Sequence, residues 1–142
     1  LLFVKLSLPE GLELRFGIGA GEVKRITGTN LEDGSAWWNA REAIEYAKKR
    51  EKSGEAWLRS WFHDDSNPSL TDSTNSYFHL EGHVLSRMKI RERRMAHQAL
   101  AGSSQIEIAK QEKLSQSAVS QALSRSGASA LLASTRIRGS EK

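Results

Sequence analysis

Five residues near the C-terminal end could recognise nucleic acid, because their amides and hydroxyls share one face of a predicted helix. These residues are Gln116, Ser117, Ser120, Gln121 and Ser124. They carry no charge and are rich in hydrogen-bond donors and acceptors, and a glutamine can form two hydrogen bonds with adenine in the major groove. The chemistry predicted for this face is therefore hydrogen bonding to base edges.

Residues that flank this face would hold the DNA backbone. Gln105, Lys110 and Arg125 are placed to contact phosphates, and Ser115 stands at the start of the helix that carries the face. The same composition also suits a small helical bundle or a dimerisation element in which Ser and Gln only face water. The neighbouring run RMKIRERR (87–94) is strongly basic, which fits phosphate contacts and a solvated helix face equally well.

Two short helices joined by a turn must position these side chains. The first is predicted from a cap at Ser104 to about Glu112, and the second from a cap at Ser115 to a stop at Gly127. Such a pair needs a small residue where the helices touch, an aliphatic residue in the turn and two aliphatic residues that lock the second helix. The residues that meet these needs are Ala109, Leu114, Val119 and Leu123.

The stretch QIEIAKQEKLSQSAVSQALS (105–124) resembles the helix-turn-helix of Cro-type phage repressors and of many bacterial regulators. It departs from them at Lys113, where the family usually has a glycine, and a positive φ at a lysine costs some strain. The resemblance implies a second helix that docks in the major groove of double-stranded DNA. Such modules often act as dimers on paired half-sites, so a homodimer is the implied assembly.

The first half of the chain is predicted to mix strands and helices. LELRFGIG (12–19) alternates apolar and polar residues, which is typical of a half-buried strand. Residues 36–49 carry apolar side chains at three- and four-residue steps and predict an amphipathic helix. Residues 57–63 predict a second strand.

The polar segment 63–76 predicts a loop and a domain boundary, with a helix start at Asn67-Pro68. Beyond it, a helical stripe runs from residue 85 to residue 100 and stops near Gly102. The polar residues from Arg136 onward are expected to fray.

The glycine-rich stretch GIGAGE (17–22) does not fit the common nucleotide-binding patterns. Its third glycine is Gly21 and not residue 22, and no Lys-Ser or Lys-Thr pair follows. The glycines alone predict a strand that ends where another backbone approaches closely.

Three blocks resemble the SatD family of bacterial proteins, and the similarity covers most of the chain. They are RFGIGAGEV (15–23), DGSAWWNAREAIEYAK (33–48) and SQSAVS (115–120). The first two blocks are also similar, more distantly, to class III nucleotidyl cyclases.

This resemblance implies an α+β fold with three parts. They are a truncated cyclase-like (ferredoxin-like) sheet-and-helix half in residues 1–66, a linking helix in 67–86 and an all-α helix-turn-helix domain in 87–138.

Arg41 falls where the cyclase helix has its phosphate-stabilising arginine, so the resemblance implies a ligand contact there. The cyclases have an asparagine at the position of Trp37, and their metal-binding aspartates would precede Leu1, where we expect a missing segment. We therefore expect no enzyme activity, no metal and no cofactor for this fragment. An ion pair of Arg41 with Glu42 or Glu45 on the helix surface is the competing explanation.

Other patterns favour structural roles. Trp37 and Trp38 are predicted to pack in the core or at its edge instead of stacking on a base. His79 and His83 are one helical turn apart, but no third ligand is evident, so we expect a surface histidine pair. The aspartates of segment 63–76 lack the spacing of a calcium loop and are expected to be solvated.

Composition narrows the class of protein. The 142 residues have a formal net charge of +4, no cysteine and a hydrophobic content of 38%, which suits an intracellular globular chain. Residues 1–70 hold ten Lys and Arg against eleven acids, whereas residues 71–142 hold eleven against six, a net +5. The longest aliphatic or aromatic run, LLFV, is too short for a membrane span, so we expect a cytoplasmic protein without membrane contact.

The sequence thus predicts a sequence-specific DNA-binding protein, a bacterial transcriptional regulator of the SatD type. The alternative is a nucleotide-sensing or cyclase-related protein, with a nucleotide effector, whose helix-turn-helix contacts protein.

Overall fold

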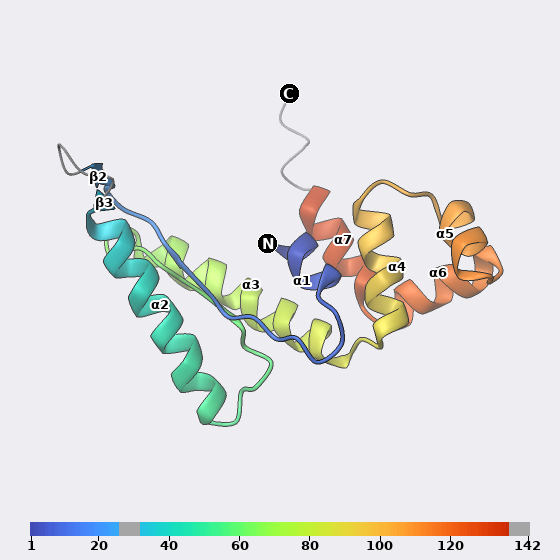
Figure 1. The fold of residues 1–142 in the computed structure, drawn as a ribbon, viewed down its shortest axis with the longest axis horizontal. Coiled ribbons are helices and arrows are strands. Elements are labelled where there is room, and N and C mark those ends of the chain that lie inside the picture. Colours follow the sequence, from blue (N-terminus) through green and yellow to red (C-terminus); the bar gives the residue numbers. More distant parts are fainter. Residues whose placement is uncertain (26–31, 137–142) are drawn as a thin grey trace. The chain divides into compact units, whose positions relative to one another are not determined.

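The structure, a computed structural model, describes residues 1–25 and 32–136, which form two compact units (Figure 1). The sheet unit is Leu14–His83, and the helical unit is Leu1–Glu13 together with the described part of Val84–Lys142. The described residues form seven helices and four short strands. The fold is therefore mixed α and β and mostly helical, which is compatible with the predicted α+β class.

The sheet unit is built around two parallel strands and the helix that connects them. β1 (Phe16–Gly19) pairs with β4 (Ser60–His63), and α2 (Ser35–Lys52) packs against both. A second, antiparallel pair joins β2 (Lys24–Arg25) to β3 (Glu32–Asp33). The strand and helix predicted for 57–63 and 36–49 correspond to β4 and α2, with shifted ends.

The glycines of β1 allow α2 to lie unusually close to the sheet. A Cβ at Gly17 would collide with the carbonyl oxygen of Ala40, and a Cβ at Gly19 with that of Ala36. The prediction of a close backbone approach at these glycines is confirmed.

The predicted strand 12–19 is shorter than expected, because β4 offers a partner only to its second half. Pairing starts where the backbone N–H of Phe16 donates to the carbonyl oxygen of Arg59, at 2.8 Å. Leu12 and Leu14 precede this point and are exposed.

The loop predicted for 63–76 is wrong from Pro68 onward, where α3 (Pro68–Arg87) begins. The Asn67 side chain accepts a hydrogen bond from the Leu70 backbone N–H at 3.0 Å, which confirms the helix start at Asn67-Pro68. Asn75 is buried, and its amide bonds both the N–H and the C=O of Phe62, each at 2.8 Å. The Asn75 side chain thus provides hydrogen-bond partners for the edge of β4 that is not paired with β1.

The helical unit packs four helices around α4 (Ile90–Leu100). They are α1 (Leu2–Ser7), α5 (Gln105–Glu112), α6 (Gln116–Arg125) and α7 (Ala128–Arg136), each in contact with α4. Its buried core residues are Leu2, Leu6, Leu85, Met88, Met95, Ala96, Ile108, Ala109, Val119, Leu123, Ala128 and Leu131. The sequence did not predict α1, whose Leu2 and Leu6 complete this core.

The helix predicted from 85 to 100 is divided in two. α3 ends at Arg87, and α4 starts after Lys89, which has an extended backbone (φ −68°, ψ 154°). The Glu92 carboxylate accepts a hydrogen bond from the Lys89 backbone N–H at 2.8 Å and so fixes the new helix start. The fraying predicted after Arg136 falls on residues outside the described part of the chain.

Candidate nucleic-acid interface

Local hydrogen bonds fix the first turn of α5 and the first turn of α6. Ser104 accepts a hydrogen bond from the Glu107 backbone N–H at 3.3 Å, and Glu107 accepts one from the Ser104 backbone N–H at 2.7 Å, which is a capping box. The Ser115 hydroxyl accepts a hydrogen bond from the Ala118 backbone N–H at 3.1 Å and caps α6. Both caps predicted from the sequence are confirmed.

Aliphatic residues lock α5 and α6 against the rest of the helical unit. Val119 and Leu123 of α6 are 0% and 3% exposed, and Ala109 of α5 is buried beside them in the same core. Leu114 lies in the turn and packs against this core while partly buried. The four packing positions predicted from spacing therefore all contribute to the core, together with Ile108 of α5, which is 0% exposed.

The side chains predicted to contact DNA lie on the outer side of the pair. Exposed are Lys110, Ser115, Gln116, Ser117, Ser120, Gln121, Ser124 and Arg125. Gln105 is half-buried, and its amide oxygen accepts a hydrogen bond from the Gln116 amide at 3.3 Å. The first residues of the two helices are therefore joined by their side chains.

The turn itself requires an unusual backbone conformation at one residue. Lys113 adopts the left-handed region (φ 54°, ψ 50°) and is the one described non-glycine residue with a positive φ. The following Leu114 N–H then reaches the carbonyl oxygen of Ala109, at 2.9 Å, and closes the end of α5. Lys113, where Cro-type repressors usually have a glycine, therefore adopts the left-handed conformation that glycine favours.

Replacing Lys113 with glycine is expected to raise the free energy of unfolding by about 0.5–1 kcal/mol, because glycine adopts this conformation without steric strain. Urea unfolding followed by circular dichroism measures the change. The matched control is Lys110→Gly, inside α5, which should lose about 1 kcal/mol. Loss of stability in both variants would contradict the expectation.

A buried carboxylate holds the end of α5 against α4. The Glu112 side chain is 5% exposed and accepts hydrogen bonds from Arg94 Nε and Nη2, both at 2.6 Å, and from Gln98 Nε2 at 3.2 Å. Arg91 bonds its carboxylate at 3.3 Å and its carbonyl oxygen as well. These hydrogen bonds, those from Arg94 above all, lower the pKa of Glu112 to about 2.

This cluster changes the interpretation of the basic run 87–94. Arg91 and Arg94 are occupied by Glu112, and Arg93 donates to the carbonyl oxygen of Leu85 at 2.9 Å. Part of the run therefore forms hydrogen bonds within the helical unit, a role that neither of the two predicted alternatives included. No spacing signal links Glu112 to residues about twenty positions earlier, so sequence reasoning missed it.

The tryptophans of α2 do not pack as predicted. Trp37 and Trp38 are 53% and 63% exposed, and the core-packing prediction is wrong for both. The residues of α2 that lie against the glycines of β1 are Ala36, Ala40 and Ile44. Ala43 and Ala47 of the same helix are fully buried, so these residues and not the tryptophans form its packed side.

Arg41 is exposed one turn beyond the tryptophans. Among the described residues it has no ion pair, because Lys48 pairs with Glu45 at 3.6 Å and His63 Nε2 lies 3.6 Å from Glu42. The predicted pairing of Arg41 with either glutamate is thus not formed. A ligand contact at Arg41 stays a prediction.

The histidines of α3 face aromatic rings. His79 contacts the Trp61 ring edge-on at 5.8 Å, and exposed His83 contacts Trp57 at 5.7 Å. Within residues 1–25 and 32–136, no group of three or more histidines or carboxylates could hold a metal ion. Asp64 accepts hydrogen bonds from the backbone and hydroxyl of Ser66, which makes it part of a turn.

Comparison with known proteins gives one match. No curated protein and no solved structure matches the chain. No helix in the described part is long and apolar enough to cross a membrane. The model of the SatD family matches residues 3–138, which is nearly the whole chain and includes all three blocks that suggested the resemblance. The chain therefore belongs to the SatD family.

Proposed function

We propose that this SatD family chain binds double-stranded DNA in a sequence-specific manner and acts as a bacterial transcriptional regulator. In this proposal, α5 and α6 form a helix-turn-helix, and α6 docks in the major groove. The proposal rests on the two-sided character of α6.

The observation that carries the proposal is an uncharged, hydrogen-bonding face opposite a fully packed one. Gln116, Ser120 and Gln121 are exposed, whereas Val119 and Leu123 are buried on the other side of the helix. A major groove admits an α-helix whose outer side chains offer donors and acceptors to the base edges. Uncharged side chains suit this position because they do not require a counter-ion when water is excluded.

The geometry of the pair supports readout by α6. The Gln105–Gln116 hydrogen bond and the Ser115 cap restrict the first turn of α6, where recognition helices contact bases. Side chains held by such supporting bonds lose less freedom on binding. Gln116 donates one amide hydrogen to Gln105 and keeps its oxygen and second hydrogen available for a base.

The exposed basic residues of α5, α6 and the turn between them support a small number of phosphate contacts. Lys110 and Arg125 are exposed on α5 and at the end of α6, and Lys113 is exposed in the turn. Arg91 and Arg94 are already engaged by Glu112, although both side chains are about half exposed. We therefore assign the main phosphate contacts to Lys110 and Arg125.

The proposal is tested by selecting a duplex from a random library and titrating it at about 50 and 200 mM salt. Two phosphate contacts predict a loss of affinity of roughly tenfold over this range, because each contact releases counter-ions. Lys110→Gln should reduce the salt dependence, and Lys49→Gln, an exposed lysine of α2, is the matched control. Absence of a selected sequence, or binding that ignores salt, would overturn the proposal.

One observation favours the alternative of a nucleotide-sensing protein. Trp37, Trp38 and Arg41 are all exposed on neighbouring turns of α2, so they offer stacking surfaces and a cation. A melting temperature raised by ATP or GTP, without duplex selection, would favour this alternative.

A further inference from the structure

Three large apolar side chains are exposed together where α2 begins. Trp37 and Trp38 are 53% and 63% exposed, and Val23 is 56% exposed. Val23 lies near the tryptophans, because a Cβ at Gly34, the residue before α2, would come within 3.3 Å of the Val23 Cα atom. Single exposed apolar residues are common on protein surfaces, whereas a group of them marks a place where a partner binds.

Several hydrogen bonds hold the backbone that carries the two tryptophans. The Ser35 hydroxyl accepts a hydrogen bond from the Glu22 backbone N–H at 2.9 Å, and the Ala36 N–H donates to the Glu22 carbonyl oxygen at 3.2 Å. The amide of buried Asn39 donates to the carbonyl oxygen of Ala20 at 2.8 Å. The rings therefore project from a fixed helix start, and little backbone order has to be gained when a ligand binds.

The two indole rings and a nearby cation have no partners within residues 1–25 and 32–136. Neither Trp37 nor Trp38 contacts another aromatic ring, and neither indole N–H donates a hydrogen bond there. Arg41 follows them by four and three residues, is exposed and forms no ion pair in the same range. Residues at these spacings share one side of a helix. The start of α2 thus presents two flat aromatic surfaces beside a guanidinium group.

The size of this surface decides between kinds of partner. The exposed parts of the two indoles amount to at most roughly 300 Å², since a whole aromatic side chain buries about 150–250 Å². A stable protein interface takes about 800 Å² from each partner, so the indoles supply well under half of what a second copy of the chain would need. An unpaired nucleobase needs only the face of one ring, and its phosphate needs a cation.

The directions of the two rings favour a strand over a single nucleotide. Consecutive residues of an α-helix point about 100° apart, because one turn takes about 3.6 residues, so one base cannot stack on both rings. We propose that Trp37, Trp38 and Arg41 bind single-stranded nucleic acid. Two unpaired bases stack on the indoles, and Arg41 contacts a neighbouring phosphate. The site lies in the sheet unit and does not depend on duplex binding by α5 and α6.

The test titrates the full chain with hexathymidylate, a DNA strand without internal base pairs, to about 1 mM and follows the indole N–H signals by NMR. The chain has four tryptophans, and Trp57 and Trp61 are internal controls because their rings contact other residues of the sheet unit. We expect the signals of Trp37 and Trp38 to shift and the other two to stay in place. If the Trp37 and Trp38 signals do not shift more than the other two, the proposal is wrong.

Two further ligands separate stacking from charge. A hexamer with the same phosphates but without bases should bind at least about tenfold more weakly than hexathymidylate, because stacking contributes most of the affinity. Thymidine monophosphate should also bind at least about tenfold more weakly, because it stacks on one ring only. Equal affinity for the abasic hexamer would mean recognition of charge alone, and equal affinity for the monophosphate would mean a mononucleotide site. Either result contradicts the proposal.

Matched variants locate the site. Trp38→Ser should weaken hexathymidylate binding at least about fivefold, whereas Leu80→Ser, which removes a side chain that is 71% exposed on α3, should leave it unchanged. Arg41→Gln should reduce the salt dependence of binding, with exposed Lys49→Gln as its control. Equal effects of Trp38→Ser and Leu80→Ser would overturn the assignment. The selected duplex should bind the parent chain and Trp38→Ser equally, which separates this test from that of the proposed function.

Discussion

Replacing Gln116 and Gln121 together with alanine is expected to weaken binding to the selected duplex by about thirtyfold or more, because each lost pair of base contacts removes roughly 1–3 kcal/mol. Both side chains are exposed on the outer face of α6 and take no part in the core. The free energy of unfolding should therefore change by less than about 0.5 kcal/mol per substitution, apart from the Gln105–Gln116 bond. Fluorescence anisotropy with the labelled duplex measures the loss.

The control for this double variant is Gln111→Ala, an exposed glutamine of α5 outside the proposed contact set. It should leave the affinity for the selected duplex unchanged. Binding to unrelated duplexes should be similar for all three proteins, because phosphate contacts do not depend on these amides. If the folded double variant bound the selected duplex as tightly as the parent chain, α6 would not be the recognition helix.

Sequence alone was sufficient for α5 and α6 because the signals that define them are local. Ser104 and Ser115 cap their helices within three residues, and Leu114 and Val119 mark the core side through spacing. Even the left-handed residue at Lys113 could be located, since the resemblance to Cro-type repressors places a glycine there. Short-range hydrogen bonds and helical periodicity thus fix this part of the molecule.

Elsewhere the outcome depended on contacts between distant segments. Polar Asn75 looks like a loop residue in the sequence, but it bonds the free edge of β4 from within a helix. Trp37 and Trp38 look like core residues, but they are exposed, and the glycines of β1 receive Ala36, Ala40 and Ile44 of α2 instead. Neither effect can be predicted from composition or from hydrophobic periodicity, because each depends on which distant segment of the chain packs against the residue.

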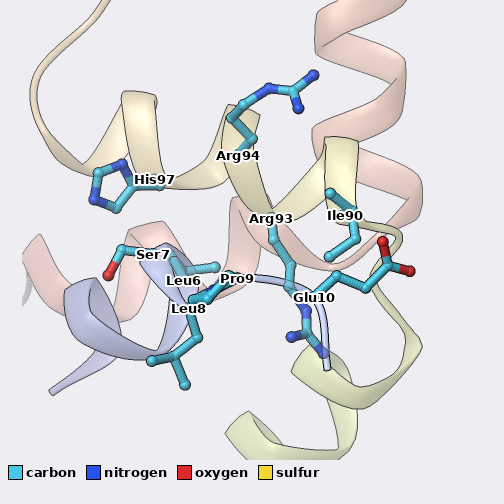
Figure 2. A pocket seen from close by; sticks show the side chains of 9 residues that line it. All are labelled: Leu6, Ser7, Leu8, Pro9, Glu10, Ile90, Arg93, Arg94 and His97. Carbon is cyan, nitrogen blue, oxygen red and sulfur yellow. The ribbon is translucent and has the colours of Figure 1, made fainter. Parts of the chain in front are cut away.

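The same limit applies to the features that surround the candidate site. α1 is six residues long, and its place is set by the leucines that it buries against α4, not by any helix signal. The hollow lined by Leu6, Leu8 and Ile90 (Figure 2) depends on that placement, so no sequence pattern predicts it. The pairing of Glu112 with Arg94 likewise joins two residues that are 18 positions apart, on consecutive helices α4 and α5.

That pairing leads to the second large effect: Glu112→Gln is expected to lower the free energy of unfolding by about 2–3 kcal/mol at neutral pH. A carboxyl whose pKa falls from 4.5 to about 2 on folding contributes at most about 3 kcal/mol. The arginines keep part of their hydration, since Arg91 and Arg94 are 49% and 53% exposed, so the loss should stay below that of a fully buried pair.

The pH dependence identifies the cause of this loss. Because folding lowers the pKa of Glu112, its contribution is fully present above pH 4.5 and disappears as the pH falls toward about 2. Urea unfolding of the parent chain and of Glu112→Gln should therefore differ most near pH 7 and converge as the pH approaches 2. Glu45→Gln, at an exposed α2 position, is the control and should stay parallel to the parent chain. A constant difference between parent and Glu112→Gln across this range would mean that packing, and not the charge on Glu112, joins α5 to α4.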